Sequence, residues 1–169
     1  TNQTVVSKDG ATSSAFRLTY RADTDSWCFA LRAKDQQGAP QASACGTAAV
    51  VGRWTHLVGI YDDAETRLKL YVDGTLAADV EPAADWRTAW GAGWNAAGPV
   101  VVGRGLDAAA GGPVEQFAGQ TDYFSECILT GAAPEAFRAW LGEGVPLAEQ
   151  GEGDLGARMA RAAADTPAI

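Results

Sequence analysis

The chain has 169 residues, of which 47% are hydrophobic, which is enough for one domain with a sizeable core followed by a tail. Its 13 basic and 21 acidic side chains give a net charge of -8, which opposes binding to nucleic acid and to anionic lipid surfaces. No run of about 18 apolar residues occurs, so we expect no membrane insertion.

Alternation typical of strands begins near the amino terminus. Residues 4–8 read as a strand that ends in an Asp-Gly turn, and residues 15–21 and 27–32 read as two further half-buried antiparallel strands. Their apolar faces consist of Phe16, Leu18 and Tyr20 and of Trp27, Phe29 and Leu31, with Arg17 and Arg21 on the opposite face. Because the first strand reads as one in mid-fold, we expect the chain to be an excised piece of a longer polypeptide.

The three cysteines leave an odd count. Cys28 and Cys45 lie on successive predicted strands joined by the polar loop 34–41, so a disulfide across this hairpin is favoured and would suit an exported protein. The alternative is that all three, including Cys127, are small buried hydrophobes. Neither a CxxC pair nor a His cluster accompanies them, so we expect no zinc site.

The segment 52–77 carries the most specific pattern. It reads as a strand, GRWTHLVGIYD, then an acidic loop, a second strand, LKLYV, and an Asp-Gly turn into a third strand. Apolar residues lie on both faces of the first of these strands, which places it near the middle of a sheet. The single histidine, His56, is expected to be a packed and hydrogen-bonded core residue within this strand rather than a catalytic base.

Later segments alternate between loops and short regular elements. Residues 81–97 read as a long loop, 98–104 as a short valine-rich strand, and 105–113 as a second, glycine-rich loop. Residues 117–129 read as a closing strand and 134–141 as a short helix, with Pro at its first position and Gly142 beyond. Residues 143–169 read as a linker or tail, weakly helical in its last part.

Several of these segments resemble a known family. The sequences GRWTHLVGIYD, LKLYVDG, WNAAGPVVVGR and FAGQTDYFSECIL are similar to the laminin G-like family within the concanavalin A-like lectin/glucanase superfamily. The resemblance implies an all-β fold, an antiparallel two-sheet jelly-roll sandwich with a short C-terminal helix, over residues 1–142. Family members generally have one or two further strands at the start, so this domain is expected to lack its first strands. Of the acidic triplet usual in the closing strand, only Asp122 matches.

Catalytic patterns are absent from the sequence. Hydrolases on this fold use paired carboxylates, typically spaced as Glu-x-Asp-x-x-Glu, and the chain has no such spacing. Asp122 and Glu126 share one face of the predicted closing strand but lack the remaining acid. No phosphate-binding glycine loop with a lysine occurs either. The sequence therefore predicts that the chain is not an enzyme, with a glycoside hydrolase remnant as a remote alternative.

Two kinds of ligand site are suggested instead. Trp86, Trp90 and Trp94 recur every four residues in the predicted loop and would form a platform for stacking on sugar rings. The alternative is that they plug the edge of the sandwich. Calcium is a frequent partner in the wider group that the chain resembles, and the available ligands in loops or at strand ends are Asp62, Asp63, Asp107 and Asp122. The alternative is that these acids are simply solvated.

The sequence favours a noncatalytic recognition module that binds carbohydrate or a protein surface within a larger secreted or cell-surface protein. The alternative is a structural spacer that packs against neighbouring domains of the same polypeptide and has no ligand of its own. Ten arginines against three lysines, with abundant Ala and Gly, would suit a bacterial genome of high GC content.

Overall fold

A computed structural model describes residues 1–91 and 93–121, and the strands of this part pair antiparallel in three sheets. The largest sheet has five strands in the order β4-β3-β2-β1-β8. Their bounds are Gln3–Asp9 for β1, Ser14–Arg21 for β2, Ser26–Arg32 for β3, Gln41–Ala48 for β4 and Val100–Val102 for β8. The predicted strands at 4–8, 15–21, 27–32 and 98–104 are thereby confirmed.

The second sheet is the meander predicted for residues 52–77. Its strands are β5 (Leu57–Asp62), β6 (Arg67–Val72) and β7 (Thr75–Val80), in that order. The two-residue turn between β6 and β7 places Asp73 at φ 50° and Gly74 at φ 77°, the positive values that a hairpin turn of this kind requires. The Asp-Gly pair of the sequence therefore fixes this turn.

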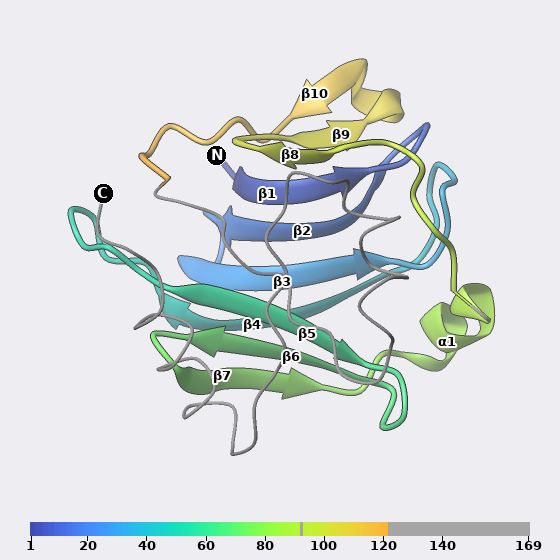
Figure 1. The fold of residues 1–169 in the computed structure, drawn as a ribbon, viewed down its shortest axis with the longest axis horizontal. Helices are drawn as coiled ribbons and strands as arrows, with labels where there is room; N and C mark the ends of the chain where they lie inside the picture. The colour runs from blue at the N-terminus through green and yellow to red at the C-terminus, as the bar shows by residue number, and fades with distance from the viewer. Residues whose placement is uncertain (92, 122–169) are drawn as a thin grey trace, which may run out of the picture. The chain divides into compact units, whose positions relative to one another are not determined.

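The remaining elements are short. A hairpin of β9 (Gly105–Asp107) and β10 (Gly112–Val114), with the 3₁₀ turn η1 (Ala108–Ala110) between its strands, lies beside β1 and β8, and the helix α1 (Ala84–Trp90) lies at one end of the strands (Figure 1). The core lies between the two larger sheets. Its buried residues are Val6, Leu18, Phe29, Leu31, Ala33, Ala42, Ala44, Leu68, Leu70, Val72 and Trp86.

Close approach of the two sheets depends on a glycine. Gly59 on β5 lies directly over the ring of Phe29 on β3, and a Cβ atom at this position would overlap the ring. The apolar residues of β6 fill the space beside it, because Leu68, Leu70 and Val72 alternate with outward-facing polar or aromatic residues. The predicted two-sheet antiparallel sandwich is therefore confirmed.

The disulfide between Cys28 and Cys45 is confirmed as well. The two cysteines are direct partners across β3 and β4, and their Cα atoms lie 4.1 Å apart. This separation is typical of a non-hydrogen-bonded cross-strand pair, in which the two facing side chains are closest. The bond ties β4 to β3 at its solvent-facing side.

Three predictions about strands and strand positions were wrong. Within the described residues β5 is at the edge of its sheet, with β6 as its one neighbour, rather than in the middle. His56 is exposed and precedes β5, because its backbone bonds to Asp73 at the end of β6 instead of continuing the strand. The glycine-rich segment 105–113 forms β9, η1 and β10 instead of a loop.

The prediction of a loop over residues 81–97 was wrong for the first half of this segment, which forms α1. Asp85 lies in the first turn, where a negative charge is favourable, and Gly91 ends the helix with φ 55°. Trp86 and Trp90 are four residues apart, so they share one helix face and stack with ring centroids 4.9 Å apart. Packing of this face, rather than helix propensity, accounts for so short a helix.

Part of the closing strand and all of the C-terminal helix predicted for 134–141 lie outside the described residues. Residues 117–121, the described part of the predicted closing strand, do not form a strand. The tail 143–169 and the residues Asp122, Glu126 and Cys127 also lie outside the described part.

Trp86 is the largest fully buried side chain, and we predict that the fold depends on it. Its ring is 1% exposed, and its Nε1 donates a hydrogen bond of 2.9 Å to the carbonyl oxygen of Leu31. Trp86→Ala should lower the free energy of unfolding by about 3–5 kcal/mol, because it leaves a cavity and removes this hydrogen bond. Urea unfolding measures this. Trp54→Ala is the matched control, since Trp54 is 64% exposed, and an equal loss there would contradict the prediction.

Asp35 connects two loops at the end of the five-stranded sheet. Its carboxylate accepts hydrogen bonds from the backbone N–H groups of Ala11 (2.5 Å), Thr12 (2.8 Å) and Ser13 (3.1 Å) and from the Thr12 hydroxyl (2.6 Å). Burial alone raises the pKa of Asp35, but these hydrogen bonds outweigh it and hold the pKa below its ordinary value. The charged form is therefore bound more favourably in the folded state than in the unfolded one.

The sign of this shift predicts acid sensitivity. Because the folded pKa is depressed, the stabilisation is complete above the unfolded pKa of about 3.9 and is lost as the pH falls through the folded pKa. Asp35→Asn should unfold at a lower urea concentration than the wild type at pH 7, and the gap should close near pH 3. Unfolding midpoints measured at several pH values test this. A gap that stays constant, or that Asp63→Asn reproduces, would refute the assignment.

Candidate functional site

The outer face of the five-stranded sheet, which points away from the core, carries polar and small side chains. Strand alternation places Arg17, Thr19 and Arg21 of β2 there, beside residues of β3 and β4. A hollow of about 50 Å³ lies on this face. Its lining residues are Asn2, Arg17, Thr19, Arg21, Cys28, Ala30, Gln41, Ser43 and Glu115. Small residues at the cross-strand partners Ala30 and Ser43 account for its floor.

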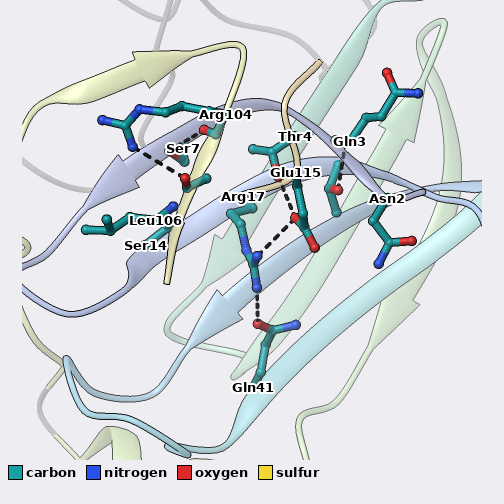
Figure 2. A network of polar contacts seen from close by, with 12 residues as sticks. Asn2, Gln3, Thr4, Ser7, Ser14, Arg17, Gln41, Arg104, Leu106 and Glu115 are labelled. Atoms are coloured by element: carbon teal, nitrogen blue, oxygen red, sulfur yellow. Dashed lines mark hydrogen bonds and ion pairs between the residues drawn. The ribbon is translucent and has the colours of Figure 1, made fainter. Parts of the chain in front are cut away.

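Arg17 is the centre of a hydrogen-bond network at the hollow (Figure 2). Its Nη1 donates to Oε2 of Glu115 at 3.0 Å, and its Nη2 donates to Oε1 of Gln41 at 2.9 Å. Gln41 in turn donates from Nε2 to the hydroxyl of Ser43 at 3.3 Å. The Arg17 side chain is 12% exposed and that of Glu115 is 22% exposed, so this ion pair is shielded from water and holds the polar groups in fixed positions.

Glu115 reaches Arg17 from the end of β10 with a strained backbone. Its φ is 53°, which is unfavourable for a residue with a side chain. Two hydrogen bonds from Thr4 hold it: the N–H of Thr4 donates to the Glu115 carbonyl at 2.6 Å, and its hydroxyl donates to Oε2 at 2.7 Å. Strain that the surroundings enforce in this way is frequent at functional sites.

A second polar cluster attaches the segment before β9 to the outer side of β1. Asp9, which is 4% exposed, accepts hydrogen bonds from Ser7, Ser14 and Arg104, the last at 2.8 Å. The backbone N–H of Leu106 donates to the Ser14 hydroxyl at 2.8 Å (Figure 2). Next in line, Gly105 lies against Arg17, where a Cβ atom would be 3.0 Å from its Cδ. This segment therefore packs against Arg17, outside the lining of the hollow.

Arg32 is a further cation on the same face. It lies opposite Gln41 in the pairing of β3 and β4, and its Nε is buried without a hydrogen-bond partner among residues 1–91 and 93–121. Burial lowers the pKa of its guanidinium, and the positive charge of Arg17 lowers it further. Arginine nevertheless stays protonated in proteins, so the face retains this charge.

The structure places the three predicted tryptophans near α1, outside the lining of the hollow. Trp86 is fully buried and offers no ring face to a ligand, which corrects the prediction of a three-tryptophan platform. Trp90 is half-buried against Trp86 and Tyr61, and Trp94 donates from Nε1 to the carbonyl oxygen of Arg32 at 2.9 Å. Ligand contact by Trp90 or Trp94 stays a prediction.

Two of the four acidic residues predicted for calcium form hydrogen bonds in the described part, and calcium binding stays a prediction. Asp62 accepts from the Glu65 N–H and from Lys69, and Asp107 accepts from the N–H of Ala109 at the start of η1. Residues 1–91 and 93–121 contain no group of three or more His, Cys, Asp or Glu side chains placed to hold a metal ion. Asp63 is exposed in the β5–β6 turn, and Asp122 lies outside the described part.

Sequence reasoning missed the residues that form the network. The outward position of Arg17 was visible from the alternation of β2, but the pairing with Glu115, 98 residues later, carried no local signal. Gln41 was equally hidden, because its partner lies on a strand two positions away in the sheet.

The geometry defines a class: a two-sheet β-sandwich with a polar hollow on the outer face of one sheet. A family model of laminin G type, described as the concanavalin A-like lectin/glucanases superfamily, matches residues 1–124. The chain therefore belongs to this family, and the family predicted from the sequence is confirmed. No curated protein and no solved structure matches the chain. Among the described residues, no helix is long and apolar enough to cross a membrane.

We predict that Glu115 is needed to neutralise Arg17. Glu115→Ala should lower the free energy of unfolding by about 1–3 kcal/mol, because it leaves a shielded guanidinium without its carboxylate. Asp79→Ala is the control: it breaks the more exposed Arg67–Asp79 pair and should cost less than about 1 kcal/mol. Urea unfolding of both variants compares them, and equal losses would argue against a special role of Glu115.

Proposed function

We propose that the chain is a noncatalytic recognition module that binds carbohydrate through the outer face of its five-stranded sheet. Membership of a lectin-like family supports a binding role. The observation that carries the proposal is the hollow lined by the Arg17, Gln41 and Glu115 network. This network presents fixed donors and acceptors on a rigid sheet, which is what recognition of hydroxyl groups needs.

The size of the hollow decides what part of a ligand it admits. A volume of about 50 Å³ holds about three to five groups the size of a water molecule, on the measure that assigns roughly 10–15 Å³ to one. One substituent and its neighbouring hydroxyls fit, but a complete sugar ring does not. We infer that the face binds part of a glycan chain that lies across it.

The lining supports binding rather than hydrolysis. Glu115 is the one carboxylate among the described residues that line the hollow, and it is paired with Arg17. Glycoside hydrolysis ordinarily requires two carboxyl groups about 5–9.5 Å apart. A hydrolase remnant therefore remains the weaker proposal.

The expected setting is outside the cytosol. The Cys28–Cys45 disulfide and the family both fit an extracellular location, because such bonds persist in oxidising compartments. We propose that the chain is part of a secreted or cell-surface protein. Within it, we propose that residues 1–142 form the jelly-roll domain and that 143–169 form a linker or tail.

Calorimetric titration with plant and microbial polysaccharides tests the function. We predict saturable binding that Ser43→Tyr abolishes, since the larger side chain would fill the hollow while suiting a solvent-facing strand position. Thr75→Tyr, at an exposed position on β7, is the matched control and should bind as the wild type does. Both variants should keep the free energy of unfolding of the wild type within about 0.5 kcal/mol.

Other outcomes point elsewhere. Binding that persists in Ser43→Tyr would show that the binding site lies outside the hollow, and Trp90→Ala would then be the next variant to test. Release of reducing sugar that Glu115→Gln abolishes would overturn the noncatalytic assignment. Flat titrations with a folded sample would favour the structural spacer that packs against other domains of its polypeptide, and binding to proteins alone would favour a protein ligand.

A further inference from the structure

Three arginines on the outer face of β2 and β3 differ in how their charge is compensated. Arg17 is paired with Glu115 at 3.0 Å, and Arg21 is paired with Asp23 at 2.6 Å. Arg32 has no ion pair within the described residues, and its Nε is buried without a hydrogen-bond acceptor. Among the described residues, the face thus holds one guanidinium that forms no ion pair and whose Nε has no acceptor.

The sheet register brings Arg32 next to Arg17. Arg17 lies opposite Ala30 on β3, and Arg32 is two residues further along the same strand, on the same face. Diagonal neighbours of this kind are about 7–8 Å apart at their Cα atoms, within reach of long side chains. Gln41, which lies opposite Arg32 on β4, reaches back to accept a hydrogen bond from Arg17 at 2.9 Å.

Two features of Arg32 are unfavourable for the ligand-free protein: its buried Nε has no acceptor among the described residues, and its charge lies near that of Arg17. A guanidinium N–H that is removed from water without an acceptor loses its hydration, and the charge of Arg17 adds repulsion. Asp107 attracts Arg32 but forms no ion pair with it. An anion bound at the end of the guanidinium would offset the repulsion from Arg17, because the planar group matches a carboxylate with two parallel hydrogen bonds.

We propose that Arg32, with Arg17 beside it, forms a subsite for the carboxylate of an acidic sugar residue, such as a uronic acid, in a glycan chain. This inference rests on the proposed recognition function and names the ligand class of the same face. The neighbouring side chains Gln41 and Ser43 offer amide and hydroxyl groups to the hydroxyls that accompany such a carboxylate.

Charge favours an isolated carboxylate over a dense polyanion. The chain carries a net charge of -8, and Glu115 lines the hollow itself, so a ligand with many closely spaced charges would be repelled. A single carboxylate seated on two guanidiniums avoids most of this repulsion. The polar lining gives no apolar pocket for the side chain of a protein ligand, so the sugar carboxylate is the better fit.

Matched ligands test the inference. Oligosaccharides that contain glucuronate or galacturonate are titrated into the protein, each beside its methyl ester, which has nearly the same shape but no charge. We expect esterification to weaken binding by about 10- to 100-fold, as expected for loss of one charged hydrogen-bonded pair. Arg32→Gln should weaken binding of the acid by the same factor and leave the ester unaffected. Arg67→Gln, a strand arginine on the other sheet, is the control and should change neither.

Stability supplies a second readout. Because the Arg32 Nε has no partner within the described residues, Arg32→Gln should unfold at the same urea concentration as the wild type or at a higher one. A purely structural arginine would instead lose stability on substitution. A marked loss of stability in this variant would therefore overturn the assignment.

The remaining outcomes separate this inference from the proposed function. One outcome supports the recognition function but refutes the carboxylate subsite. In that outcome the acid and the ester bind equally, Arg32→Gln binds both as the wild type does, and Ser43→Tyr binds neither. If no glycan of either charge binds, both fail. If an acidic peptide binds more tightly than every acidic oligosaccharide, and Arg32→Gln abolishes that binding, the sugar assignment is overturned.

Discussion

The packing of the two larger sheets through Gly59 and Phe29 is the constraint on which the rest of the structure depends. Because a glycine on β5 admits the Phe29 ring, the sheets approach closely and every second residue of their strands is committed to the core. The outward positions of β2, β3 and β4 are thereby freed from packing. Function is accordingly expected among side chains that alternate with the core residues, and the polar hollow lies at these positions.

The outer face is organised by contacts between residues far apart in the sequence. Thr4 and Arg17 bind Glu115 at sequence separations of 111 and 98 residues, so the network forms only when β10 is brought onto the edge of the sheet. The strained backbone of Glu115 is tolerated because Thr4 holds both its carbonyl and its carboxylate. Such a network is rigid, and rigid polar groups distinguish ligands better than flexible ones.

Stability and recognition place opposite demands on this face. The disulfide, the buried tryptophan of α1 and the apolar core stabilise the sandwich, whereas Arg32, which lies beside Arg17 with no ion pair in the described part of the chain, is expected to lower its stability. Groups of this kind are retained in proteins when they serve binding, because their donors are prepared for a ligand before it arrives. The acidic character of the rest of the chain limits which anions gain from it.

The sequence by itself determined the family, the strands of the two larger sheets, the Asp73–Gly74 turn and the Cys28–Cys45 pair, because a two-residue period, turn residues and strand neighbours are local features. Tertiary structure alone decided that Trp86 belongs to a buried helix and that His56 is exposed. It also decided that Arg17 pairs with Glu115 while Arg32 forms no ion pair with another described residue. These outcomes depend on which distant segments pack together, and the energies of such contacts are not encoded in the neighbouring residues.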